Sequence, residues 1–414
     1  METKKLIDCC EFISDGDHLP PPKSDSGVPF ITISNITGQN KLSLEDTMFV
    51  PESYYNGLNE NKKAQKGDIL YSVVGSFGKP VYVDFDKQMV FQRHIAILRP
   101  KRNVNARFIY YTMLNPQFYK LVDKLAIGCS QRTVTLDTLR NIEISLPDKD
   151  IQDKTVEVLS LIDRKIDENC KINDNLEQQA KLIYDYWFTQ FDFPDENGKP
   201  YCSSGGKMVW NERLKRTIPE GWITSPLSEI FTFKSGYSFS SDLYEASGKY
   251  KLLTIKNVQS NGIYLNVDNY INILPDNVPE YCLLKAKDIL MSLTGNVGRV
   301  GIMYADNCLL NQRVALAEPV DINQRVFVYF LLKSDIIHKQ YEMIANGSSQ
   351  QNLSPIEAEK VIIAYNPEVA IKFSTLCSEH LNTIVSNLAE NQELINIRDW
   401  LLPMLMNGQA TISD

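Results

Sequence analysis

The sequence predicts an α+β protein with two similar globular domains, each followed by a long exposed helix. Two observations lead to this fold class. The chain of 414 residues repeats one plan at an offset of about 220 residues, and each copy runs from short strand-like segments into a heptad pattern. We expect globular domains at residues 1–150 and 223–367, helices at residues 151–191 and 368–409, and a linker at residues 192–222.

The composition is that of a folded protein. Apolar residues make up 43% of the chain, no stretch approaches the ~20 consecutive apolar residues of a membrane helix, and the N-terminus lacks the apolar segment of a signal peptide. The eight cysteines show no zinc-binding spacing, which favours a reduced, cytoplasmic protein without a metal. The net charge of −8 is concentrated in the predicted helices, since residues 151–205 carry 6 basic and 11 acidic side chains.

Each domain is expected to begin with strands and continue into a helix. Apolar residues at helical spacing occupy residues 106–126 in the first copy and residues 327–345 in the second. The strand-like runs that precede the first of these helices, separated by Gly, Pro, Asn and Asp, are residues 29–36, 68–74, 79–85 and 94–100.

The repeat is clearest around a turn with two glycines. Residues 66–79 align with residues 287–299 at an offset of 220, which places Gly75 over Gly295. The same offset places Gln92 and Arg93 over Gln312 and Arg313, and His94 over Val314. His94 is therefore expected to have no part in a mechanism that the two copies share. The other aligned segments are residues 30–36 with 252–258 and residues 128–135 with 347–354.

The heptad pattern predicts that the two long helices pair as a coiled coil. Asparagines within the seam would fix the register of the pair at some cost in stability, although a small rotation of the helix would place them at its edge. The predicted seam positions are Ile162, Ile166, Asn169, Asn173, Leu176 and Ile183 in the first helix and Ile384, Asn387, Asn391, Leu394 and Leu401 in the second.

The sequence carries no convincing catalytic signature. The run from Asn115 to Phe118 lacks the second proline of an amino-methyltransferase loop and lies within a helical pattern, so we expect a helix boundary there. The run from Gly75 to Lys79 is too short for a phosphate-binding loop. We therefore expect no catalytic residue and no bound cofactor in this chain.

Polar loops at equivalent places in the two copies carry side chains that can recognise base edges. Arg pairs well with guanine, and Gln or Asn with adenine, in the major groove of DNA. For any single residue, a structural role in holding its loop is an equally good explanation. The candidate DNA-binding residues are Ser76, Lys79, Gln92, Arg93, Ser130, Gln131 and Arg132 in the first copy and Asn296, Arg299, Gln312, Arg313, Ser349, Gln350 and Gln351 in the second.

Over essentially its whole length the chain resembles the specificity subunits of type I restriction-modification enzymes. The resemblance is most specific at residues 191–201, 203–208, 218–222 and 402–409. It implies two target-recognition domains related by pseudo-two-fold symmetry, which are separated by an antiparallel coiled coil. It also implies double-stranded DNA, two modification (methyltransferase) subunits and, through them, restriction subunits as partners. S-adenosylmethionine, ATP and Mg would then belong to those partner subunits.

The predicted helices also have a suitable length for a spacer between two half-sites of DNA. From Ile162 to Trp187 the helix would extend roughly 38 Å, close to the ~34 to 36 Å of one DNA turn. The alternative from another class is an adaptor whose two domains bind proteins, with the coiled coil as a rod and no DNA specificity. Salt-dependent, sequence-selective DNA binding would distinguish the two hypotheses.

Overall fold

The computed structural model describes the whole chain except residues 1, 39, 129–131, 346–350, 411 and 413–414. The chain divides into two compact units. Unit 1 comprises Met1–Ile166 and Glu393–Asp414, and unit 2 comprises Asp167–Gln392. Each unit holds one globular domain and a segment of each of two long helices, α5 (Lys149–Tyr184) and α10 (Ser378–Met406). The predicted α+β class is confirmed.

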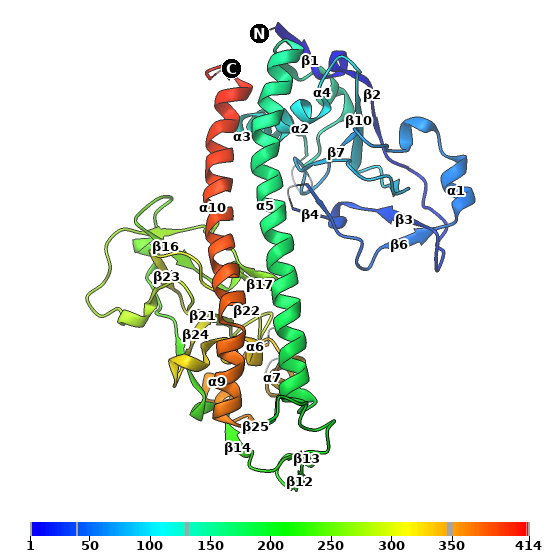
Figure 1. Cartoon of the computed structure of the whole chain (residues 1–414). Helices are drawn as coiled ribbons and strands as arrows, with labels where there is room; N and C mark the ends of the chain where they lie inside the picture. Colours follow the sequence, from blue (N-terminus) through cyan, green and yellow to red (C-terminus); the bar gives the residue numbers. More distant parts are fainter. Residues whose placement is uncertain (1, 39, 129–131, 346–350, 411, 413–414) are drawn as a thin grey trace. The chain divides into compact units, whose positions relative to one another are not determined.

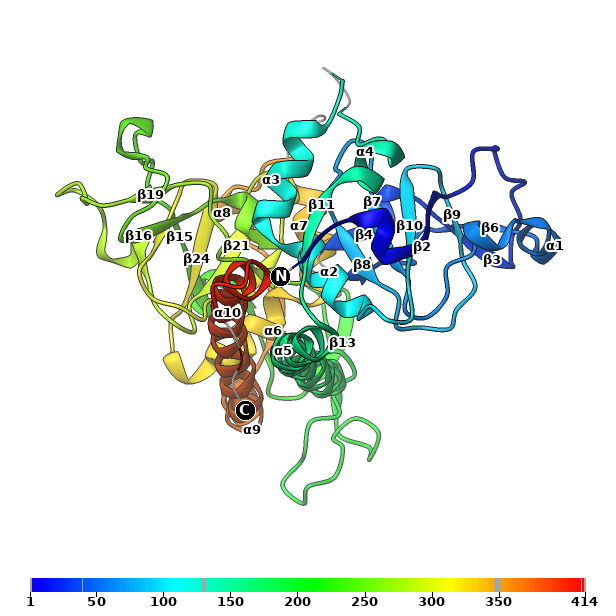
Figure 2. The same cartoon turned by 90° about the horizontal axis from the view of Figure 1, so that it is seen from above.

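A four-stranded antiparallel sheet lies at the centre of unit 1. Helices α2 (Ala106–Leu114) and α3 (Pro116–Leu125) lie on one side of it. On the other side lie α1 (Glu52–Gly57) and a three-stranded sheet of β6 (Met48–Val50), β3 (Val28–Ile31) and β9 (Val90–Phe91) (Figures 1 and 2). Both faces are therefore covered, which explains why all four residues of β7 are buried. The central order is β2 (Cys10–Asp15), β10 (Ile95–Pro100), β7 (Ile69–Ser72) and β8 (Pro80–Tyr82).

Unit 2 repeats this plan. Its central sheet is also antiparallel and is accompanied by helices α6 (Arg325–Leu332) and α7 (Asp335–Ile344). The strand order is β15 (Phe231–Ser235), β24 (Val314–Pro319), β21 (Ile289–Ser292) and β22 (Val300–Ile302), which matches the order in unit 1 element by element. The predicted internal repeat is thus a repeat of fold.

A second sheet in unit 2 corresponds to the three-stranded sheet of unit 1. Its strands are β19 (Tyr270–Ile271), β16 (Tyr250–Leu253), β23 (Cys308–Leu310) and β20 (Leu283–Leu284). In both units one pair within this sheet is parallel, β3 with β9 and β16 with β23. In each unit the strand of this parallel pair that comes later in the sequence leads directly into a turn, which precedes β10 in unit 1 and β24 in unit 2.

Shorter elements complete each domain. A two-stranded antiparallel pair joins the start of the domain to its end, β1 (Glu2–Lys5) with β11 (Glu143–Leu146) in unit 1 and β14 (Ile223–Pro226) with β25 (Ile362–Tyr365) in unit 2. The remaining short elements are α4 (Leu136–Asn141) and the pair β4 (Ile36–Gly38) and β5 (Lys41–Leu42) in unit 1, and α8 (Pro355–Glu359) and the pair β17 (Val258–Gln259) and β18 (Gly262–Ile263) in unit 2.

The long helices differ in detail from the sequence prediction. Helix α5 begins at Lys149 and passes at its end into a π-helical turn, Asp185–Thr189. The predicted second helix at residues 368–409 is two helices, α9 (Pro367–Leu376) and α10, which meet at Cys377. The Thr375 hydroxyl donates to the Ile371 carbonyl at 2.9 Å, and such bonds within a helix favour a bend.

The predicted linker at residues 192–222 contains a hairpin and lies within unit 2. Strands β12 (Met208–Asn211) and β13 (Arg216–Pro219) pair antiparallel. Trp222 is buried against Phe191, with ring centroids 5.1 Å apart, and Phe193 stacks on Tyr201 at 4.8 Å. Trp222 and Phe193 therefore belong to the core of unit 2, whereas Trp210 of the hairpin is exposed.

Candidate nucleic-acid interface

Three chain segments of unit 1 meet where β7 ends. The Val73 amide donates to the His94 carbonyl at 2.9 Å, and the Gly75 amide donates to the Arg132 carbonyl at 3.0 Å. The Val134 amide donates in turn to the Val73 carbonyl at 2.8 Å. We call residues 73–79, 92–94 and 132–135 loop cluster 1. It brings together Ser76, Lys79, Gln92, Arg93 and Arg132, which are far apart in the sequence.

Unit 2 forms the same arrangement where β21 ends. The Leu293 amide donates to the Arg313 carbonyl at 2.9 Å, the Gly295 amide to the Gln351 carbonyl at 2.9 Å, and the Leu353 amide to the Leu293 carbonyl at 2.8 Å. We call residues 293–299, 311–313 and 351–354 loop cluster 2. The backbone bonds of the two clusters correspond one to one.

These bonds correct the sequence alignment by one residue. Val73 bonds to His94 as Leu293 bonds to Arg313, and Ile95 pairs with Ser72 as Val314 pairs with Ser292. The structural equivalent of His94 is therefore Arg313, and the prediction that His94 lies over Val314 is wrong. Arg93 correspondingly matches Gln312. The cause is the connection between β8 and β10, which is one residue longer than its counterpart between β22 and β24.

A serine hydroxyl shapes the hairpin in both clusters. The Ser72 hydroxyl accepts from the Lys79 amide at 3.0 Å and donates to the Ser76 carbonyl at 3.1 Å. The Ser292 hydroxyl does the same with the Arg299 amide and the Asn296 carbonyl, at 3.1 and 2.5 Å. The run from Gly75 to Lys79 is thus a hairpin turn, as predicted.

The candidate residues differ in how freely they can contact a ligand. Arg132 is already engaged, because its guanidinium donates to the Asp123 carboxylate and lies over the Phe77 ring. Lys79 is half-buried and its ammonium donates to the Ile36 carbonyl at 3.5 Å. Gln92 and Arg299 are also half-buried, whereas Ser76, Arg93, Asn296, Gln312, Arg313 and Gln351 are exposed. The candidates Ser130, Gln131, Ser349 and Gln350 lie outside the described residues.

A recess of about 350 Å³ adjoins loop cluster 1. Its charged and titratable lining residues are Asp15, His18, Arg93 and His94. The His18 Nε2 donates to the Asp15 carboxylate at 2.5 Å, and the Arg93 Nε donates to the His94 Nε2 at 3.3 Å. Burial lowers the pKa of His94, and the charges of Arg93 and His18 lower it further. His94 was not expected to share a role with the second copy, and only the strand register shows that it occupies the position of Arg313.

The paired helices of unit 2 are joined by asparagines. The Asn169 side-chain amide donates to the Asn391 side-chain oxygen at 2.9 Å, and the Asn387 amide donates to the Asn173 oxygen at 2.8 Å. Asn169, Asn173 and Asn391 are buried. As the residue number rises along α5 it falls along α10, so the two helices run antiparallel in this unit (Figure 1).

In unit 1 a buried arginine occupies the seam. The Arg398 guanidinium, with 9% of its side chain exposed, contacts the Asp163 carboxylate at 3.1 Å. The Tyr111 hydroxyl of α2 donates to the same carboxylate at 2.7 Å, which ties the domain to the helices. The heptad count did not include Arg398, and it selected half-buried Leu401 although the neighbouring Leu402 is buried.

Unit 2 ties its domain to α5 through a different group. The Glu177 carboxylate accepts from the Tyr329 hydroxyl at 3.0 Å and pairs with the Lys333 ammonium. Nearby, Tyr184 is buried against Phe327 and Phe373, whereas Ile183, which the heptad count selected, is half-buried.

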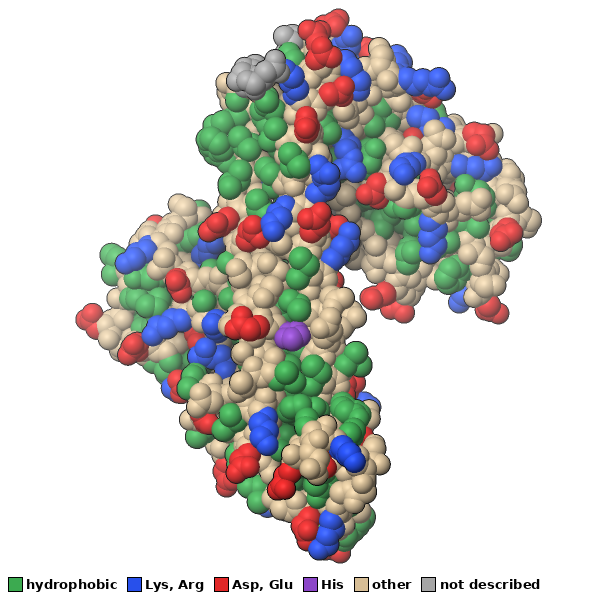
Figure 3. All heavy atoms as spheres, in the orientation of Figure 1, with side chains coloured by type: hydrophobic (Ala, Val, Ile, Leu, Met, Phe, Trp, Pro, Cys, Tyr) green, Lys and Arg blue, Asp and Glu red, His purple; other side chains and the backbone are tan. Residues whose placement is uncertain are grey.

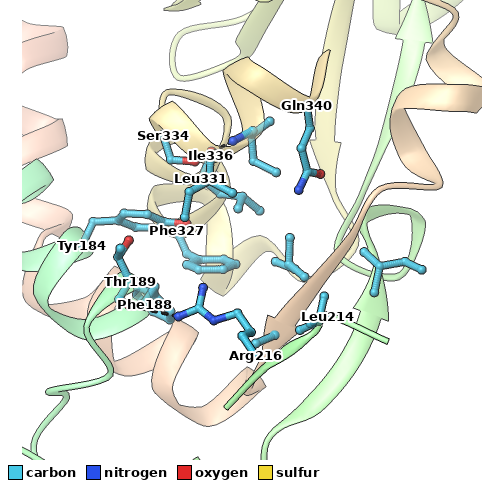
Figure 4. A pocket seen from close by; sticks show the side chains of 14 residues that line it. Tyr184, Phe188, Thr189, Leu214, Arg216, Phe327, Leu331, Ser334, Ile336 and Gln340 are labelled. Carbon is cyan, nitrogen blue, oxygen red and sulfur yellow. Dashed lines mark hydrogen bonds between the residues drawn. The ribbon is translucent and has the colours of Figure 1, made fainter. Parts of the chain in front are cut away.

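A second hollow, of about 140 Å³, lies in unit 2 (Figure 4). The aromatic rings of Tyr184, Phe188 and Phe327 line it together with Arg216. The Arg216 guanidinium donates to the Thr189 carbonyl at 3.2 Å and lies over the Phe191 ring, and burial lowers its pKa. Arg216 thereby fastens hairpin β12–β13 to the end of α5.

The surface charge is mixed. Figure 3 shows Lys and Arg interspersed with Asp and Glu over the visible face of both units, without a continuous basic stripe. Within the described residues, no helix is long and apolar enough to span a bilayer, and no three His, Cys, Asp or Glu side chains gather as metal ligands. Two similar polar loop clusters on domains tied to paired helices define a bipartite recognition protein.

Comparisons with known proteins specify this class. Residues 1–178 and 219–364 match the family described as type I restriction modification DNA specificity domain, and the chain belongs to this family. The chain is 24% identical to the type I restriction enzyme HindI specificity subunit of Haemophilus influenzae, with 84% of this chain and 87% of that protein covered. It is 25% identical to the MjaIX specificity subunit of Methanocaldococcus jannaschii, with 76% and 71% covered.

A solved structure agrees in fold. The S subunit of a type I restriction-modification system from M. genitalium matches with a TM-score of 0.55 and 19% identity, covering 98% of this chain and 96% of that one. The chain is accordingly a non-catalytic subunit that recognises DNA sequence for a type I restriction-modification system. The adaptor alternative is not favoured.

Proposed function

We propose that unit 1 and unit 2 each recognise one half of a bipartite double-stranded DNA target, through loop cluster 1 and loop cluster 2. The observation that carries this proposal is the match between the clusters. Their backbone bonds are equivalent, whereas the side chains at equivalent positions differ, with Arg93 against Gln312, His94 against Arg313 and Ser76 against Asn296. A common frame with different donors and acceptors is what two half-sites of different sequence require.

The test is DNA binding with one half-site changed at a time. Duplexes carrying the target, identified from methylated adenines in the host genome, are bound to the chain assembled with its modification subunits. Exchanging Asn296, Gln312 and Arg313 for the unit 1 residues Ser, Arg and His should alter preference at one half-site only. Altered preference at both half-sites, or at neither, would contradict the assignment of one half-site to each unit.

We propose that the paired helices hold the modification subunits and set the spacer between the half-sites. Their predicted acidic faces support the first part, because residues 151–205 carry more acidic than basic side chains. The asparagine pairs support the second, because buried polar pairs fix helix register. Inserting seven residues into both α5 and α10 should lengthen the preferred spacer, and an unchanged spacer would refute this role.

The remaining parts of the proposal concern partners and location. S-adenosylmethionine, ATP and Mg are expected on the modification and restriction subunits, with none bound by this chain. The purified chain alone should then show neither methylation nor cleavage of DNA. We place the complex in the cytoplasm, which agrees with the free thiols of all the described cysteines.

A further inference from the structure

We infer that the recess beside loop cluster 1 is the binding site for a guanine–cytosine pair, in which Arg93 contacts the guanine and His94 is the positioning residue for Arg93. The inference rests on the proposed function and names the base that unit 1 recognises there. Neither residue type nor sequence alignment indicated a role for His94. The evidence is the register of the repeat, the bond between the two side chains and the charges in the recess.

The strand register of the repeat places His94 at the position that Arg313 occupies in unit 2. The turn before β10 holds Arg93 and His94, and the turn before β24 holds Gln312 and Arg313. Each turn therefore presents one arginine, at its first position in unit 1 and at its second in unit 2. If Arg313 contacts DNA directly, Arg93 must reach its base from a turn position that is one residue earlier. A neighbouring residue is then needed to direct the Arg93 side chain.

The bond between Arg93 and His94 provides that direction. Arg93 is exposed and donates its Nε hydrogen to the Nε2 atom of half-buried His94 at 3.3 Å. This bond leaves both terminal NH₂ groups of the guanidinium free, and those groups make the paired contact with guanine O6 and N7. It also requires His94 to be neutral, with its proton on Nδ1, because a protonated imidazole has no acceptor.

The charges of the recess favour a base edge over a phosphate. Asp15 lines the recess and accepts from His18 at 2.5 Å, so a carboxylate would face an incoming phosphate. A guanine–cytosine pair instead presents acceptors on guanine and an amino donor on cytosine, which complement Arg93 and Asp15. The other lining residues, at positions 73–74 and 133–136, carry no titratable group.

Protonation of His94 should therefore weaken recognition of this base pair. The groups that face His94 are Arg93, His18 and Asp15. Burial lowers the pKa of His94 below its ordinary value, and Arg93 and His18 lower it further, so His94 is neutral at pH 7.5. As the pH falls, the protonated ring loses its acceptor and repels the guanidinium. Loop cluster 2 contains no histidine, so the half-site of unit 2 should not respond.

The experiment measures discrimination, since added positive charge raises affinity for any DNA. Fluorescence anisotropy gives the ratio of affinities for the target duplex and for duplexes with one base pair changed, at fixed salt and at pH 7.5, 6.5 and 5.5. The protein is the chain assembled with its modification subunits. At pH 7.5, Arg93→Ala should abolish discrimination at one guanine–cytosine pair, a loss of about 5- to 150-fold. The wild type should lose discrimination progressively as the pH falls below about 6.5, the ordinary pKa of histidine, because the lowered pKa of His94 lies below that value.

The matched variant is His94→Gln, whose amide oxygen keeps the acceptor without titrating. It should retain discrimination at pH 7.5 and lose little of it at pH 5.5, and thermal melting checks that it is folded. Three results would overturn the inference. Discrimination by the wild type could stay constant as the pH falls, or His94→Gln could lose as much discrimination as the wild type. The base pair whose recognition depends on Arg93 could also be one other than guanine–cytosine. If unit 1 variants changed no half-site at neutral pH, the proposed function itself would fail.

Discussion

The two loop clusters share a backbone but differ in the side chains that they present. In cluster 1 the guanidinium of Arg132 is held by Asp123, while its equivalent Gln351 is exposed and has no such partner among the described residues. In cluster 2 the Asn296 side-chain oxygen accepts from Arg299 at 2.8 Å, in the amide orientation that satisfies both groups. The Ser72 and Ser292 hydroxyls, by contrast, make identical bonds. Buried groups maintain the frame, and the exposed positions are free to vary.

The units also differ in how they are fastened to the long helices. Unit 1 uses the buried Arg398 and Tyr111 with the partly exposed Asp163, whereas unit 2 uses the buried Tyr329 with the partly exposed Glu177 and Lys333. The Lys333 and Glu177 side chains are 23% and 33% exposed, against 9% and 27% for Arg398 and Asp163. Because removing one member of a buried pair leaves a charge without compensation, the two fastenings should differ in energetic weight.

The largest expected effect is on stability. Arg398→Met should lower the free energy of unfolding by about 3 kcal/mol, because Asp163 loses its charged partner. The matched change in unit 2, Lys333→Met, should cost about 1 kcal/mol, because solvent screens that pair. Urea unfolding followed by circular dichroism measures both. Equal losses would remove the energetic distinction between the two fastenings.

The next effect concerns base recognition. Arg313→Ala should reduce discrimination at the half-site of unit 2 by about 1 to 3 kcal/mol, while Arg93→Ala does so only at the other half-site. Binding of duplexes with one altered half-site measures each ratio. Arg313→Lys serves as the control for the loss of charge, because it keeps the positive charge without the planar paired donors. If either arginine variant affected both half-sites alike, the clusters would not act separately.

A smaller effect is expected within the seam of unit 2. Asn391→Leu alone should cost about 1 to 2 kcal/mol of unfolding free energy, because buried Asn169 would lose an acceptor. The double variant with Asn169→Leu should recover much of this loss, since both polar groups are then replaced. Urea unfolding of the single and double variants gives the coupling. If the losses of the two single variants simply added in the double variant, the hydrogen bond between Asn169 and Asn391 would not be the source of the stabilisation.

The smallest effect is on the salt dependence of DNA binding. Lys79→Met should lower the slope of log affinity against log salt by about 1, with little change in half-site preference. Lys66→Met is the control, because exposed Lys66 precedes β7 and so lies at its other end from loop cluster 1. Titrations between 50 and 200 mM salt, roughly the range over which phosphate contacts are resolved, measure the slope. A change in base preference would instead assign Lys79 to base recognition.

Sequence reasoning was most successful where periodicity and repetition carry the information. The α+β class, the repeat and the helix boundary at Asn115 all follow from patterns that span many residues. Asn115 caps α3 by accepting from the Gln117 amide, as a boundary asparagine should. The polar seam at Asn169 and Asn173 also has a strict heptad spacing.

The errors come from single residues. The matching Gln-Arg pairs suggested an alignment of the two copies that places His94 over Val314, whereas strand pairing places His94 over Arg313. A difference of one residue in loop length therefore hid the role of His94. Arg398 was overlooked because a charged residue in a seam is unusual unless a partner such as Asp163 exists, and that partner is 235 residues away. Likewise, no local pattern indicates that Asp123 holds Arg132.

The most direct test of separate half-site recognition is to map methylated adenines in the host genome by single-molecule sequencing. Three strains are compared: one with the wild-type gene, one without it, and one carrying Arg313→Ala. We expect a bipartite motif that depends on the gene and that becomes degenerate in one half only in the Arg313→Ala strain. A motif that persists without the gene, or that degrades equally in both halves, would contradict recognition by two separate units.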